Sequence, residues 1–114
     1  MKNLLIVEDE FIVARDYKSI LEHDGHNVIK IVNNGKEAIE IAVKSNPDFI
    51  LMDINIKGKM NGIEAEEEIH KKQIRSKIIF ITAYDVKTYV FPEFQYYFLN
   101  KPILKNNLLS ILNN

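Results

Sequence analysis

The sequence contains no cysteine, so the chain forms no disulfide, carries no thiol nucleophile and lacks the usual ligands of zinc fingers. It also lacks an excess of charge of one sign, because fifteen Lys and Arg against sixteen Asp and Glu give a net charge of -1. A chain without a global basic field has no long-range attraction to nucleic acid. We therefore expect no direct nucleic-acid binding by this domain.

Long hydrophobic runs are missing as well. The apolar run at 49–52 is typical in length and stops far short of the roughly 20 residues that cross a bilayer. The first apolar run, at 4–7, is too short for the central region of a signal peptide and precedes no small-residue cleavage site. We expect a cytoplasmic protein that does not engage a membrane. Its 114 residues match the size of one domain, expected over 1–114.

Short apolar runs alternate with segments of helical character. The runs are at 4–7, 28–32, 49–52 and 78–81, and a fifth, rich in aromatic residues, is at 96–99. The first, third and fourth runs are apolar at every position, as in parallel strands that helices cover on both faces. The second run is interrupted by Lys30, and we place it and the fifth run at the sheet edges. The pattern predicts an α/β fold with one doubly wound parallel sheet.

Two helix starts have a local signature. Asn34 precedes Glu37 by three positions, and Asn61 precedes Glu64 by the same interval. A side-chain oxygen at the first position of each pair accepts a hydrogen bond from a backbone N–H of the first helical turn. The side chain of the glutamate can in return accept a hydrogen bond from the backbone N–H of the capping residue. We therefore expect helices to begin just after Asn34 and Asn61.

Polar residues follow the predicted strands at their carboxyl ends. Glu8 and Asp9 follow the first strand, Asp53 closes the third, Thr82 closes the fourth and Lys101 follows the fifth. In doubly wound sheets ligands bind beyond these strand ends, where the strand order reverses. These side chains are therefore predicted to converge.

The types of these side chains indicate phosphoryl chemistry. Neighbouring carboxylates such as Asp9 and Asp53 repel each other unless a cation lies between them, and hard oxygen ligands suit magnesium. The ammonium of Lys101 and the hydroxyl of Thr82 can each bind one phosphoryl oxygen. Together they predict phosphoryl transfer, in which positioning and charge neutralisation supply most of the catalysis.

Five motifs at these positions resemble the receiver domain of two-component response regulators. They are LIVEDE (5–10), PDFILMDI (47–54), NGIEA (61–65), ITA (81–83) and KP (101–102). The resemblance implies a flavodoxin-like (βα)5 fold with a five-stranded sheet of order 2-1-3-4-5. It also implies that Asp53 takes a phosphoryl group from a histidine kinase or phosphotransfer protein. Such a domain phosphorylates itself from a donor and slowly dephosphorylates, and is not a metabolic enzyme.

The resemblance also implies roles for individual residues. Glu8, Asp9 and Asp53, with the backbone carbonyl of Asn55, would surround Mg²⁺ or Mn²⁺. Lys101 and Thr82 would bind the phosphoryl oxygens. Phe98 matches the position of the family's aromatic switch residue, which is expected to turn inward as Thr82 moves toward the phosphoryl group.

The segment between Thr82 and Lys101 departs from the family pattern. It is a few residues shorter than usual and contains Pro92, so we expect the fourth helix to be short or irregular. Tyr84, two residues past Thr82, would stand beside the phosphoryl group and could shield it from water. The chain has five Tyr and six Phe, and seven of these aromatic residues lie in this segment. They fill the core, or they form an interaction surface. The resemblance implies that the face made by the fourth helix, the fifth strand and the fifth helix transmits phosphorylation to a downstream partner, an output domain or a second copy of the chain.

Other local expectations follow from single residues. Glu10 is interpreted as an acid in the first turn of a helix. A cis Lys101-Pro102 peptide would direct the lysine inward. His23, His26 and His70 are predicted to lie on the surface.

Two other functions remain open at this point. One is a receiver-like interaction module that works without phosphorylation. The other is an aspartyl-phosphate phosphatase. That chemistry requires a second Asp two residues after the nucleophile, and this position is occupied by Asn55.

Overall fold

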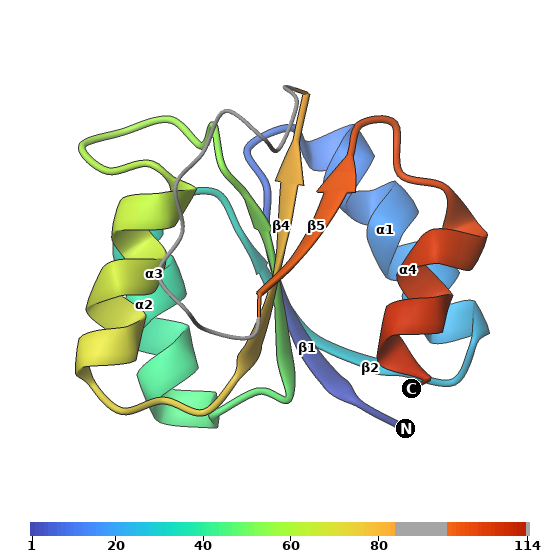
Figure 1. The fold of residues 1–114 in the computed structure, drawn as a ribbon, viewed down its shortest axis with the longest axis horizontal. Coiled ribbons are helices and arrows are strands. Elements are labelled where there is room, and N and C mark those ends of the chain that lie inside the picture. The colour runs from blue at the N-terminus through green and yellow to red at the C-terminus, as the bar shows by residue number, and fades with distance from the viewer. Residues whose placement is uncertain (84–95, 114) are drawn as a thin grey trace.

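The computed structural model describes residues 1–83 and 96–113, in which strands and helices alternate (Figure 1). The strands are β1 (Asn3–Val7), β2 (Asn27–Val32), β3 (Phe49–Asp53), β4 (Lys77–Thr82) and β5 (Tyr96–Asn100). The helices are α1 (Phe11–His23), α2 (Gly35–Ser45), α3 (Gly62–Lys71) and α4 (Lys105–Leu112), of which α4 is the C-terminal helix. The expected irregular helix, with Pro92 and Tyr84, lies outside the described residues.

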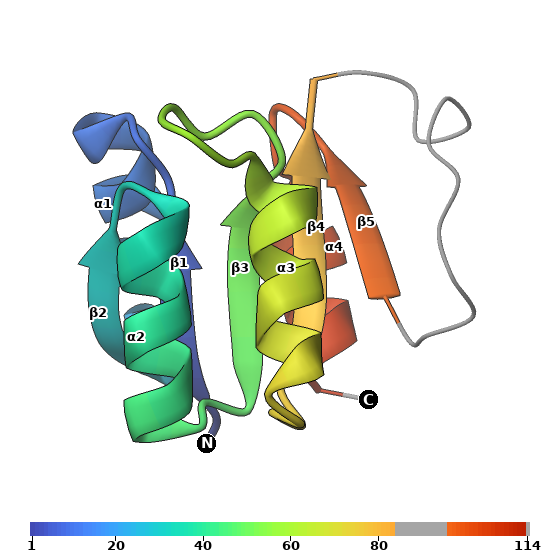
Figure 2. The same cartoon turned by 90° about the vertical axis from the view of Figure 1, so that its left-hand side faces the viewer.

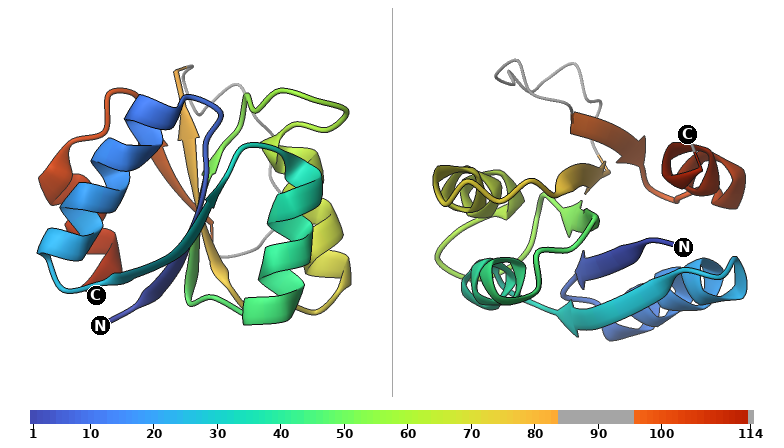
Figure 3. Two further views of the ribbon diagram at one scale, coloured as in Figure 1. Left: turned by 180° about the vertical axis from the view of Figure 1, so that it is seen from behind. Right: turned by 90° about the horizontal axis from the view of Figure 1, so that it is seen from below.

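The five strands form one parallel sheet in the order β2-β1-β3-β4-β5, which confirms the predicted order. Figure 2 shows β2 and β5 at its two margins, as expected from Lys30 and from the aromatic-rich run. Helices α2 and α3 cover one face and α1 and α4 the other (Figure 3). The carboxyl ends of all strands therefore lie along one edge.

Alternation along the central strands builds two cores. Leu5 and Ile50 point toward α2 and α3, whereas Leu4 and Leu51 point toward α1 and α4. All four are 0% exposed. Since successive side chains of a strand point to opposite faces, a strand that helices cover twice must be apolar throughout.

Both predicted helix caps are present. The side chain of Asn34 accepts a hydrogen bond from the backbone N–H of Glu37 at 2.9 Å. Asn61 and Glu64 form a reciprocal capping box, with distances of 2.9 and 3.0 Å. The next residue, Gly62, packs so tightly on β3 that a Cβ atom there would overlap the backbone oxygen of Asp53. The start of α3 thereby fixes the end of β3.

One histidine prediction is wrong. His23 and His70 are exposed, but His26 is buried and its Nδ1 accepts a hydrogen bond from the backbone N–H of Lys2 at 3.0 Å. The turn after α1 brings His26 against the start of β1, where the imidazole satisfies a backbone donor.

Within the described residues, no helix combines the length and the apolar character that crossing a membrane requires.

Candidate functional site

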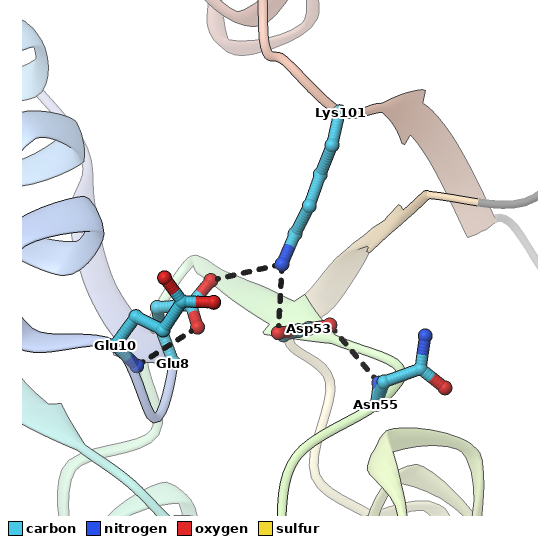
Figure 4. A network of polar contacts seen from close by, with 5 residues as sticks. All are labelled: Glu8, Glu10, Asp53, Asn55 and Lys101. Carbon is cyan, nitrogen blue, oxygen red and sulfur yellow. Dashed lines mark hydrogen bonds and ion pairs between the residues drawn. The ribbon is translucent and has the colours of Figure 1, made fainter.

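The carboxyl ends of β1, β3 and β5 bring three charged side chains together. Asp53 is 2% exposed, and its Oδ2 accepts a hydrogen bond from Lys101 Nζ at 3.0 Å. The same Nζ lies 3.4 Å from Oε1 of Glu8 (Figure 4). Of the residues predicted to converge, the structure brings Glu8, Asp53 and Lys101 into contact.

Glu8 is an unusual group, because it is a carboxyl only 1% exposed. Burial raises its pKa to about 7, and the neighbouring charge of Asp53 acts in the same direction. The backbone N–H of Glu10, which donates to Oε2 at 3.1 Å, and the charge of Lys101 oppose the rise in pKa. Oε1 accepts no hydrogen bond from the described residues. This buried oxygen can therefore accept a bond from a metal cation.

Lys101 remains a cation in this setting. Burial acts to lower its pKa, but the hydrogen bond to Asp53 and the charges of Asp53 and Glu8 outweigh burial and raise it. The Lys101-Pro102 peptide is cis, as predicted. The backbone N–H of Lys101 donates to the carbonyl of Thr82 at 2.8 Å, which joins the end of β5 to the end of β4.

Asp53 has a donor for each carboxylate oxygen. Lys101 binds Oδ2, and the backbone N–H of Asn55 donates to Oδ1 at 2.9 Å. The side chain of Asn55 extends away from the carboxylate (Figure 4). A donor to each oxygen fixes the plane of the carboxylate.

The remaining predicted residues lie directly after β1, on β4 and on β5. Thr82 is 0% exposed at the end of β4. Asp9 is partly exposed directly after Glu8. Phe98, on β5, is half-buried and stacks on Phe80 with ring centroids 5.5 Å apart. Tyr84 falls outside the described residues.

The residues at the site fit a divalent metal. Carboxylate oxygens of Glu8, Asp9 and Glu10 all lie within 4.8 Å of one another. Such hard oxygen donors are the ligands that Mg²⁺ and Mn²⁺ take in proteins. The buried Glu8 oxygen without a hydrogen-bond donor is a second sign of fit.

Glu10 is the residue whose place the sequence interpretation missed. It is not in the first turn of α1 but at its N-cap, where its side chain makes no capping hydrogen bond. Three consecutive acids at a strand end, Glu8 to Glu10, were the available signal.

A groove of about 750 Å³ opens beside the site, between α1 and the loop after β5. Lys101 and Tyr17 line it together with Ile12, whose side chain is 84% exposed. Burial raises the pKa of Tyr17 to about 12, with a further contribution from the charge of Glu8. The groove opens beside Lys101, and Glu10 also lines it.

Comparison with known proteins gives consistent matches. A family model described as the response regulator receiver domain matches residues 4–113. The phyllosphere-induced regulator PhyR of Methylorubrum extorquens is 39% identical over 82 residues, which are 71% of this chain and 30% of that protein. The transcriptional regulatory protein PdtaR of Mycobacterium tuberculosis is 32% identical over 78% of this chain and 42% of its own length. The chain thus spans less than half of either curated relative.

The solved structures agree with the sequence matches. The signal receiver domain of a modulated diguanylate cyclase from Desulfovibrio desulfuricans G20 superimposes with a TM-score of 0.83 and 30% identity. The match covers 99% of this chain and 91% of that one.

Proposed function

The chain belongs to the response regulator receiver domain family, and we propose that residues 1–114 form one phosphoacceptor domain whose nucleophile is Asp53. The donor is a phosphohistidine of a histidine kinase or of a phosphotransfer protein, encountered in the cytoplasm. The observation that carries this proposal is the buried Asp53 carboxylate held by Lys101 Nζ at 3.0 Å.

The reaction follows from the donors around Asp53. A carboxylate oxygen attacks phosphorus, the new O–P bond forms, and the P–N bond to the imidazole breaks with its electron pair staying on nitrogen. The other ring nitrogen of the donor carries a proton, so the imidazole leaves as a neutral group. The ammonium of Lys101 exchanges its contact with Asp53 for a phosphoryl oxygen, and the Thr82 hydroxyl donates to a second. Preorganised donors of this kind stabilise the charge that develops in the transition state.

Glu8, Asp9 and Asp53, with the backbone carbonyl of Asn55, would hold Mg²⁺ or Mn²⁺. A divalent cation bound there supplies neutralisation of the phosphoryl charge. The buried Glu8 oxygen that accepts no hydrogen bond from the described residues, and the clustered carboxylates of Glu8 and Asp9, support this assignment.

Phosphorylation would be transmitted through Thr82 and β5. When Thr82 moves toward the phosphoryl group, Phe98 changes the exposure of its ring, which is half-buried against Phe80 in this structure. Tyr84 is proposed to shield the acyl phosphate from water. The surface around β5 and α4 would then contact a downstream partner, an output domain or a second copy of the chain, without direct contact to nucleic acid.

The phosphatase alternative is less favoured. It requires an acid two residues after the nucleophile, where the amide of Asn55 carries no acidic proton and extends away from Asp53. A phosphorylation-independent module would not need the charged centre at Asp53.

Intact mass measurement after incubation with acetyl phosphate and Mg²⁺ tests the proposal. The unmodified protein should gain one phosphoryl mass and Asp53→Asn none. Asp48→Asn is a matched control, because Asp48 lies at the other end of β3 and an Asn there keeps an oxygen acceptor for the backbone N–H of Asn3. Phosphorylation of Asp53→Asn to the same extent as the unmodified protein would contradict the proposal.

A further inference from the structure

Glu10 has a side chain that the fold does not use. It occupies the N-cap of α1, yet only its backbone makes hydrogen bonds: the N–H donates to Oε2 of Glu8, and the carbonyl accepts from the N–H of Ala14. The side chain is exposed and makes no hydrogen bond or ion pair among the described residues. Its charge is therefore available for a ligand.

The position of that charge is specific. The Glu10 carboxylate lies beside the Glu8 carboxylate (Figure 4). One oxygen each of Glu8, Asp9 and Glu10 lies within a 4.8 Å group. Three like charges at this spacing repel one another, and a cation among them removes that repulsion.

A second observation points to the same ligand. Glu8 is only 1% exposed, and its Oε1 is buried and accepts no hydrogen bond from the described residues. The ammonium of Lys101 donates its hydrogen bond to Asp53 at 3.0 Å and forms an ion pair with Glu8 Oε1 at 3.4 Å without a hydrogen bond. The Glu8 oxygen thus lacks the donor that a buried carboxylate normally has.

We infer that Glu10 is a further residue of the divalent cation site, which binds the ion through its carboxylate beside Glu8 and Asp9. The inference rests on the proposed cation site and adds to it a solvent-exposed residue. In this arrangement Glu8 anchors the ion from the buried side, whereas Glu10 holds it from solvent, directly or through one bound water.

Neighbouring Glu37 shows why proximity alone is not enough. It lines the same small hollow as Glu8 and Asp9, but its carboxylate is outside the group of clustered oxygens. It is exposed and lies in the first turn of α2. Glu37→Gln therefore removes one nearby charge without removing a proposed ligand, which makes it the matched control.

The test is calorimetric titration of the unphosphorylated protein with Mg²⁺ and with Mn²⁺ at pH 8, without a phosphodonor. Glu10→Gln should weaken binding about tenfold, the effect of removing one unit charge roughly 5 Å from a divalent ion in water. Glu37→Gln should change Kd less than twofold, and Glu10→Asp should retain part of the lost affinity. Thermal unfolding in EDTA should show one cooperative transition for each of the four proteins, so that a loss of affinity cannot be ascribed to loss of the fold.

The outcomes separate this inference from the proposed function. Equal affinities of Glu10→Gln and the unmodified protein would overturn the role of Glu10 and leave the cation site in place. Equal losses for Glu10→Gln and Glu37→Gln would also overturn it, because they would reflect net charge alone. Absence of any cation binding by the unmodified protein would overturn the cation site itself.

Discussion

Asp53 and Lys101 contact each other, but the strands that carry them are held differently. Every residue of β3 is buried, and the strand pairs with β1 on one side and β4 on the other. In β5 four residues are half-buried and the last is exposed, and the strand pairs with β4 alone. The carboxylate therefore stands on the most constrained strand, whereas the ammonium follows an edge strand.

This difference suits the chemistry proposed for each group. A nucleophile gains from a fixed position, because misplacement raises the barrier to reaction. In the proposed reaction Lys101 exchanges Asp53 for a phosphoryl oxygen, and an edge strand with fewer neighbours adapts more readily. The half-buried ring of Phe98 is on the same adaptable strand.

The largest expected effect compares one leucine from each strand. Leu51→Ala on β3 should lower the free energy of unfolding by about 4 kcal/mol, because it empties a fully buried position. Leu99→Ala on β5 should cost about 1 kcal/mol, because Leu99 is only partly buried. Urea unfolding followed by circular dichroism measures both. Similar losses for the two variants would mean that β5 is held as firmly as β3.

The pH dependence of stability tests the buried end of β1. The folded pKa of Glu8, about 7, lies above its ordinary value of 4.5, so its contribution is fully present below pH 4.5 and is lost as pH rises through 7. Without divalent cations, stability should fall by up to about 3 kcal/mol across this window. Glu8→Gln should remove this part of the slope in urea unfolding at several pH values. An unchanged slope would show that another group is responsible.

A smaller effect is expected from the hydrogen bond that ties β5 to α3. Tyr96 Oη donates to Oε2 of Glu66 at 2.6 Å, and burial raises the pKa of that carboxyl. Tyr96→Phe should cost about 1.5 kcal/mol, because it leaves a buried carboxyl without this donor. Tyr97→Phe, on the opposite face of β5, is the control and should cost less. If both variants unfold at the same urea concentration, this bond does not secure the strand.

The sheet and the centre of the site could be predicted from the sequence for a simple geometric reason. Runs that are apolar at every position, such as 49–52, specify strands that are covered on both faces. Parallel strands then place Asp53 and Lys101 at one edge, whatever the details of the loops. Both helix caps depend on residues three positions apart, so they too are local.

The features that were missed depend on contacts that no local pattern encodes. His26 is buried because it meets the backbone of Lys2, which is distant in sequence. Glu10 faces the cluster because its backbone is extended, with φ of -94° and ψ of 106°, at the N-cap instead of helical. The high pKa of Glu8 follows from burial by the assembled fold. These are properties of the tertiary structure.

The long separation of Asp53 and Lys101 along the chain has a consequence for synthesis. Their contact needs β5 to lie beside β4, because the backbone of Lys101 is joined to the end of β4. A nascent chain released from the ribosome tunnel only as far as β4 would carry all the carboxylates of the site without its ammonium. Acquisition of that contact therefore marks the moment at which the C-terminal part of the domain has docked.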